Sequence, residues 1–284
     1  MNTNTIVRLV TIALAAAVAL PAMVAAQPRK EPEPRLELVI SAAAVADAAA
    51  AAAPDSKLWA GAKPQTVSLQ PQQFVEPFQE KAAVASVQVR ALRDEQRLAL
   101  LLEWADQSEN STIGPAQFSD GCGVMFAPSG TPPSVMMGAT GRPVRLFNWK
   151  AAWATPSQLA PLAWVDVVPL SGGSGGPIRP DTAIYATAAK ATTGGWAVDN
   201  PVSGPSYPSL VEELVAEGPG TITHKGFAPG GGGSWKGGRW RVVLVLPGEL
   251  AATSPVAFAV WDGGQRDAGS RKSISPWVTL DVKR

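Results

Sequence analysis

The feature that most constrains the fold is a set of short runs in which every second residue is apolar. In residues 97–104, for example, Leu98, Leu100, Leu102 and Trp104 occupy alternate positions. Successive side chains of a β-strand point to opposite faces, so this period of two is typical of strands. Further runs of the same kind lie at residues 239–246, 255–261 and 278–282. The pattern therefore predicts a protein built mainly from β-strands.

The turn-forming residues support the same conclusion. The chain has 284 residues, of which 27 are Gly and 26 are Pro, and this share is typical of short strands joined by many turns. We predict a β-sandwich with a few short helices and long Gly/Pro-rich loops. Residues 209–217 are predicted to form one of the short helices, and the glycine runs at 171–177 and 230–233 are predicted to be flexible loops.

The first 26 residues are predicted to be an export signal. Arg8 supplies a positive start, residues 9–19 are apolar, and Val24-Ala25-Ala26 has the small residues typical of a cleavage site. Cleavage there would leave Gln27 as the first residue and direct the chain to the periplasm.

The rest of the chain is predicted to contain one domain. Residues 27–54 are interpreted as a low-complexity linker, because 41–53 is almost pure Ala and has no amphipathic pattern. Residues 55–284 are predicted to form the folded domain. After removal of the signal, no stretch approaches the roughly 20 apolar residues that span a bilayer, so no membrane span is expected.

The charge balance does not favour a nucleic acid or an anionic membrane as partner. Without Arg8, the chain has 23 basic and 23 acidic residues and therefore a net charge of zero. Contact with another protein is the more natural use of such a surface.

The chain has a single cysteine, Cys122, and a single histidine, His224. One Cys cannot form an internal disulfide, a four-Cys cluster or the Cys-x-x-Cys-His motif of covalent haem. One His excludes bis-His haem ligation. His224 has no nucleophile motif near it and is predicted to lie on the surface or in a loop. No catalytic residue is therefore assigned.

One segment carries a possible soft ligand for a metal centre. Met136-Met137-Gly138 lies in a Pro/Gly-rich loop, where adjacent methionines either pack beneath the loop or offer a thioether to haem iron. Lys272 follows a Gly-rich turn and would ordinarily be a solvated lysine. Met125 is predicted to belong to the core, and Lys236 to an exposed hairpin turn.

A series of short segments follows in order from about Asp55 to the C-terminus: Leu58-Trp59, 87–92, 100–104, 124–126, Met137-Gly138, Pro143-Val144, 148–151, 214–218, Gly220-Thr221, 238–243, 256–263 and 272–275. In these segments the sequence resembles a known family, the haem b (γ) subunits of type II dimethyl sulfoxide reductase-family molybdoenzymes. That group includes ethylbenzene dehydrogenase, dimethyl sulfide dehydrogenase, selenate reductase and chlorate reductase.

The resemblance implies a β-sandwich that holds one haem b between a Met and a Lys. Met137 matches the family's Met-Gly step and Lys272 its Lys-Ser-Ile-Ser segment, so these two residues are the implied axial ligands of the iron. It also implies an iron–sulfur (β) subunit and a molybdenum (α) subunit as partners in the periplasm, with a soluble periplasmic cytochrome as a further electron carrier. The partners of the haem propionates stay open among Arg90, Arg145 and Arg241.

Two other functions remain as alternatives. One is a carbohydrate-binding or other ligand-binding β-sandwich without haem, in which some of the ten Trp residues would stack on sugar rings. The other is a free-standing periplasmic cytochrome or haem chaperone without molybdenum partners.

Overall fold

The computed structural model describes residues 38–113, 116–128, 131–153, 209–248 and 253–282, all within the unit Pro34–Arg284. The predicted signal at 1–26 and the glycine run at 171–177 lie outside these residues. No helix in the described ranges has both the length and the apolar character needed to cross a membrane.

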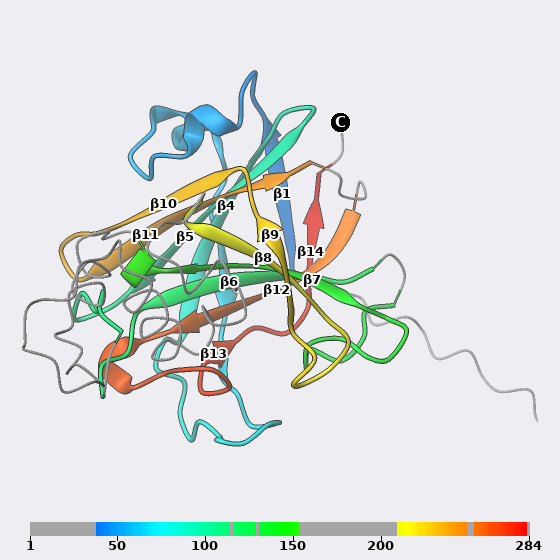
Figure 1. The fold of residues 1–284 in the computed structure, drawn as a ribbon. Helices are drawn as coiled ribbons and strands as arrows, with labels where there is room; N and C mark the ends of the chain where they lie inside the picture. The colour runs from blue at the N-terminus through cyan, green and yellow to red at the C-terminus, as the bar shows by residue number, and fades with distance from the viewer. Residues whose placement is uncertain (1–37, 114–115, 129–130, 154–208, 249–252, 283–284) are drawn as a thin grey trace, which may run out of the picture. The chain divides into compact units, whose positions relative to one another are not determined.

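The described residues form fourteen strands and a few single-turn 3-10 helices, which confirms the mainly β prediction (Figure 1). The strands are β1 (Val39–Ala44), β2 (Gln65–Ser68), β3 (Gln70–Pro71), β4 (Ser86–Arg93), β5 (Arg97–Ala105), β6 (Gly121–Phe126), β7 (Val144–Lys150), β8 (Val211–Ala216), β9 (Thr223–Phe227), β10 (Gly230–Trp235), β11 (Arg239–Pro247), β12 (Thr253–Trp261), β13 (Ser273–Ile274) and β14 (Val278–Asp281). The 3-10 helices are η1 (Ala49–Ala51), η2 (Lys57–Gly61), η3 (Ala151–Trp153) and η6 (Gly263–Gln265).

The strands pair in the order β10-β11-β5-β4-β1-β14-β12-β6-β7-β8-β9, and β1 joins the two halves. Residues 39–41 pair in parallel with β14, whereas residues 42–44 pair in parallel with β4. Figure 1 shows β1 in blue beside β14 in red, so the two ends of the described chain meet in this strand pair. We call the half that contains β4, β5, β10 and β11 layer B, and the half that contains β6–β9, β12 and β14 layer A.

The alternating residues of the two layers share one core, as expected of a sandwich. One buried cluster contains the alternating residues of β5, Val124 of β6 and the alternating residues Val256, Phe258 and Val260 of β12. The Trp149 ring of β7 meets the Trp240 ring of β11 edge to face, with ring centres 5.2 Å apart. The period of two in the sequence therefore corresponds to the inner face of each layer.

The glycine run at 230–233 is a strand, β10, and not the flexible loop that composition predicts. A Cβ atom at Gly233 would lie 2.3 Å from the Trp149 ring, and one at Gly231 would lie 2.5 Å from the Val243 carbonyl oxygen. Glycine is needed here because the edge strand lies directly against the large aromatic core.

Two further predictions from the sequence are wrong. Residues 211–216 form strand β8 rather than a helix, with Val211 and Ala216 buried. Residues 39–53 are folded rather than a linker, because β1 pairs on both sides and η1 packs on the outer face of layer B with Trp59, Leu101 and Val243. Alanine suits both positions, since its small side chain lets the backbone approach the sheet closely.

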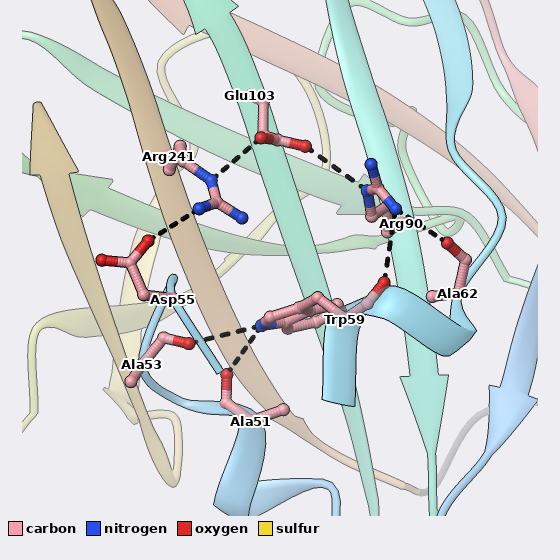
Figure 2. Close-up of polar contacts among 8 residues, drawn as sticks. All are labelled: Ala51, Ala53, Asp55, Trp59, Ala62, Arg90, Glu103 and Arg241. Atoms are coloured by element: carbon pink, nitrogen blue, oxygen red, sulfur yellow. Dashed lines mark hydrogen bonds and ion pairs between the residues drawn. The ribbon is translucent and has the colours of Figure 1, made fainter. Parts of the chain in front are cut away.

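A polar network holds this N-terminal segment to layer B (Figure 2). Glu103 of β5 accepts a hydrogen bond from Arg241 Nε at 2.9 Å and forms an ion pair with Arg90 Nε at 3.5 Å. Arg90 Nη1 donates to the carbonyl oxygens of Trp59 and Ala62, and Arg241 Nη1 donates to Asp55 at 2.7 Å. One carboxylate thus orients both guanidinium groups that bind the segment.

Replacing Glu103 with Gln is expected to lower the free energy of unfolding by about 1–3 kcal/mol, because two guanidinium groups lose a partner that is 11% exposed. Urea denaturation of the chain measures this loss. The matched control is Asp47→Asn, which weakens the exposed Arg97–Asp47 pair and should cost less than about 1 kcal/mol. Equal effects of the two changes would contradict the role given to Glu103.

Candidate functional site

A large cavity lies on the outer face of layer A. It has a volume of about 770 Å³, within the range typical of small-molecule and cofactor sites. Its floor comes from the residues of β6, β7, β8, β9 and β12 that do not face the core. In β6, for example, Cys122 and Val124 point into the core cluster, and Gly121, Gly123 and Met125 line the cavity.

The centre of the floor is built from small residues. Gly121 and Gly123 of β6 pair with Trp261 and Ala259 of β12, and Ala257 is the next cavity residue of β12. A Cβ atom at Gly123 would lie 3.2 Å from the Phe147 carbonyl oxygen. These positions leave a flat area of sheet that a planar ligand can cover.

Loops on several sides form the walls of the cavity, and they carry exposed apolar side chains. Phe74, Ile113 and Ile222 are 56%, 55% and 52% exposed, and all three line the cavity. Exposed apolar residues gathered around a hollow are typical of a site for an apolar ligand or partner.

Met137 lies in the loop between β6 and β7 and lines the cavity, together with Met136 and Met125. Met137 has a backbone φ of 71°, a left-handed conformation that is uncommon for residues other than glycine. Gly138 follows with φ of 91°, and a Cβ atom there would lie 2.8 Å from the Ala216 carbonyl oxygen. Glycine at 138 therefore lets this turn rest against the end of β8, with Met137 packed on the cluster around Met125 and Ala257.

Lys272 directly precedes β13, which pairs with β12, and it lines the same cavity. Its Nζ atom is 5.1 Å from the centre of the Trp261 ring, and no ion pair among the described residues includes it. Burial lowers the pKa of the Lys272 amine to about 8, because the charged form loses its hydration. The structure thus brings Met137 and Lys272, which are far apart in sequence, to one cavity.

A group of polar residues in this cavity was not predicted from the sequence. His224 was predicted to lie on the surface or in a loop; it is in strand β9, half-buried and facing the cavity. Its Nδ1 atom is 3.8 Å from a Glu212 carboxylate oxygen, and Asn148 donates a hydrogen bond to Glu212 at 2.8 Å. The alternation of apolar and polar residues that is typical of a strand was hidden in this part of the sequence. The reason is a bulge between Glu213 and Leu214, which shifts the pairing of β8 with β9.

The three arginines considered as propionate partners do not line the cavity. Arg90 and Arg241 bind Glu103 in layer B, and Arg145 binds Glu213 at 2.6 Å. The cationic groups that do line the cavity among the described residues are Lys150 and Lys272, and His224 lines it as well. Lys236 is exposed in the turn between β10 and β11, away from the cavity lining.

Comparison with known proteins decides the family. A sequence model of the family described as "Ethylbenzene dehydrogenase" matches residues 56–273, which include the strands of the cavity floor and both Met137 and Lys272. The chain belongs to the ethylbenzene dehydrogenase family. The resemblance stated from the sequence is therefore confirmed.

A curated relative of this member of the ethylbenzene dehydrogenase family comes from Haloferax mediterranei. It is named "Putative respiratory nitrate reductase heme subunit ORF7" and is 25% identical over 237 residues. The match covers 79% of this chain and 66% of the relative, so the chain spans slightly less than two thirds of that protein.

Solved structures resemble the chain only distantly. A family 9 carbohydrate-binding module from Caldicellulosiruptor kristjanssonii in complex with cellotriose has a TM-score of 0.39 at 9% identity, covering 87% of this chain and 94% of that chain. The same module in complex with glucose has a TM-score of 0.38 at 8% identity, covering 86% and 95%. A likeness at this level says nothing about the ligand of this chain.

Proposed function

We propose that this chain binds one non-covalent haem b in the layer A cavity and serves as a periplasmic electron-transfer subunit of a molybdoenzyme complex. One observation carries the proposal: Met137 and Lys272, the two ligands implied by the resemblance, line the same cavity. Membership of the ethylbenzene dehydrogenase family and the heme subunit named in Haloferax mediterranei support it.

The cavity residues fit a haem. The small residues Gly121, Gly123, Ala257 and Ala259 leave a flat floor, and the exposed apolar residues on the loops match the apolar faces of a porphyrin. Thioether and amine groups are both known donors to iron, the amine in its neutral form. Cys122 is fully buried in the core on the other side of β6, so it is not placed to form a covalent link to a ligand in the cavity.

Haem would supply one-electron transfer and no substrate chemistry of its own here. The chain's residues hold it and set the state of its ligands. Lys272 must lose its proton before its amine can donate a lone pair, and the buried position that lowers its pKa to about 8 reduces the cost of that loss. Met137 has no proton to lose.

The exposure of the tryptophan side chains does not favour the carbohydrate-binding alternative. Of the eight tryptophans among the described residues, Trp59, Trp104, Trp149, Trp153 and Trp240 are buried, and the other three are half-buried. The described surface therefore has no fully exposed Trp platform of the kind on which a sugar ring could stack.

The relay function is tested by purifying the tagged chain from the periplasm of its native cell. We expect it to bring with it an iron–sulfur subunit and a molybdenum subunit, and to begin at Gln27 after cleavage of residues 1–26. Such partners are needed because a single Cys cannot hold iron–sulfur clusters. Recovery of a haem-loaded chain without partners would instead support a free-standing cytochrome, and turnover of an organic substrate by the isolated chain would contradict the relay.

A further inference from the structure

Three buried aspartates meet where β5, β6 and β12 reach the same end of the sandwich. Asp106 follows β5, Asp120 precedes β6 and Asp262 follows β12. Each contributes a carboxylate oxygen, and these oxygens lie within 4.8 Å of one another. The three residues are only 4%, 0% and 9% exposed, so this is not an ordinary solvated acidic patch.

The hydrogen bonds of the three carboxylates leave Asp106 Oδ2 as a buried oxygen without a partner among the described residues, whereas Asp106 Oδ1 accepts one from the Ser108 N–H at 3.1 Å. Asp120 is well supplied, since it accepts hydrogen bonds from the backbone N–H groups of Asn110 and Gly263 and from Trp240 Nε1, at 2.7–2.8 Å. Asp262 accepts one from the Gln265 N–H at 3.1 Å. Asp106 Oδ2 accepts none from any described residue, although Asp106 is nearly fully buried. A buried carboxylate oxygen without a hydrogen-bond partner, on a residue that lies beside two other carboxylates, is stabilised by an electropositive partner.

The surrounding residues do not provide that partner. None of the ion pairs among the described residues involves Asp106, Asp120 or Asp262. Burial raises the pKa of Asp106 to about 6 and also raises that of Asp120, and the neighbouring carboxylates add to both effects. Trp104 Nε1 partly offsets the rise in the pKa of Asp106. It forms no hydrogen bond of normal geometry with any described residue.

The atoms near the three aspartates that could bind a cation are side-chain oxygens. Asp106, Ser108 and Asn110 occupy alternate positions, the spacing with which the first three ligands of an EF-hand loop surround Ca²⁺. Ser108 Oγ, Asp262 Oδ1 and Asn110 Oδ1 also converge beside Gly264, at 2.9, 3.1 and 3.3 Å from the point where its Cβ would be. Irregular all-oxygen sets of this kind suit Ca²⁺ better than Mg²⁺, which demands a strict octahedron.

We propose that Asp106, Asp120 and Asp262 bind one Ca²⁺ ion, with Ser108 and Asn110 as neighbouring oxygen donors. The ion ties together the ends of three strands from both layers. It also anchors the described residues near Asp106 and Asp120, of which Ile113, Gln117, Phe118 and Ser119 belong to the cavity wall. The site is separate from Met137 and Lys272 and does not depend on whether the cavity holds haem.

The test is titration of the full chain with Ca²⁺ after treatment with EDTA, at constant ionic strength. We expect one Ca²⁺ per chain, a dissociation constant on the order of 10⁻⁴ M or lower, and a thermal midpoint raised by roughly 5–10 °C at saturation. Failure of Ca²⁺ to bind, or to shift the midpoint, would overturn the proposal. A shift with Mg²⁺ but not with Ca²⁺ would overturn the choice of cation.

The Asp106→Asn variant sharpens the test because it keeps the shape of the site and removes one charge. Without Ca²⁺ it should be at least as stable as the parent, since it relieves repulsion between buried carboxylates. With Ca²⁺ it should lose most of the midpoint shift. The control is Glu103→Gln, which neutralises a buried carboxylate that already has arginine partners and should retain the full shift. Equal Ca²⁺ shifts in Asp106→Asn and the parent would refute the site.

Discussion

Loss of either proposed axial ligand should change the haem spectrum and weaken or retune haem binding. We expect Lys272→Ala to free one axial position and to lower haem affinity at least tenfold. Met137→Leu, which conserves volume but removes the thioether, should keep the haem and shift its reduction potential by on the order of 100 mV, since axial ligands tune haem potentials over about 0.8 V. Absorption spectra and redox titration of the purified variants measure both effects.

The chain offers matched controls for each change. Met136→Leu alters the adjacent methionine, which also lines the cavity, and Lys236→Ala removes an exposed lysine in the turn between β10 and β11. Both should keep the parent spectrum and potential. If Met136→Leu or Lys236→Ala changes the spectrum while Met137→Leu or Lys272→Ala does not, the ligand assignment is wrong.

The two ligands should also respond differently to pH. Only the neutral amine of Lys272 can bind iron, and its pKa in the cavity is about 8 without a ligand. Coordination holds the neutral form and moves the transition to lower pH, so the ligand should be lost as the pH falls and regained as it rises. In Lys272→Ala this spectral transition should be absent, and in Met137→Leu it should remain.

Filling the centre of the cavity floor should abolish haem binding without unfolding the chain. Ala259 of β12 is half-buried and faces the cavity between Gly123 of β6 and Ile274 of β13. Ala259→Trp would place an indole where a planar ligand must lie, and we expect haem content to fall more than tenfold. The control is Ala105→Trp, at the exposed end of β5, which should keep full haem content.

Far-UV circular dichroism and the thermal midpoint establish that Ala259→Trp remains folded. A folded Ala259→Trp chain with the haem content and spectrum of the parent would show that the haem is elsewhere, even if Met137 and Lys272 prove essential for another reason.

The strands that face a single core were predictable from sequence because their apolar residues alternate. β5, β11 and β12 each carry such a run, and each lies in the shared core. β8 was missed because Leu210, Val211, Leu214 and Val215 have a spacing typical of a helix. β1 and β10 were missed because alanine and glycine carry no periodic signal, although their small size is what the packing requires at those strands.

The cavity was only partly predictable. Met137 and Lys272 were identified through resemblance to a family, and no local pattern would have paired them. The small floor residues are visible afterwards as the alternation of Gly121 and Gly123 with Cys122 and Val124. Asp106, Asp120 and Asp262 were not predictable as a group, because three strands that are distant in sequence must first be placed side by side.

The most direct test of the account is the haem content of the full chain isolated from the periplasm. We predict a Soret band and the pyridine haemochrome spectrum of haem b, at one haem per chain, with all of the haem extracted by acidified organic solvent. Haem that stays on the denatured polypeptide would contradict non-covalent binding. A colourless chain that takes up no added haem and binds glycans would contradict the central claim and support the carbohydrate-binding alternative.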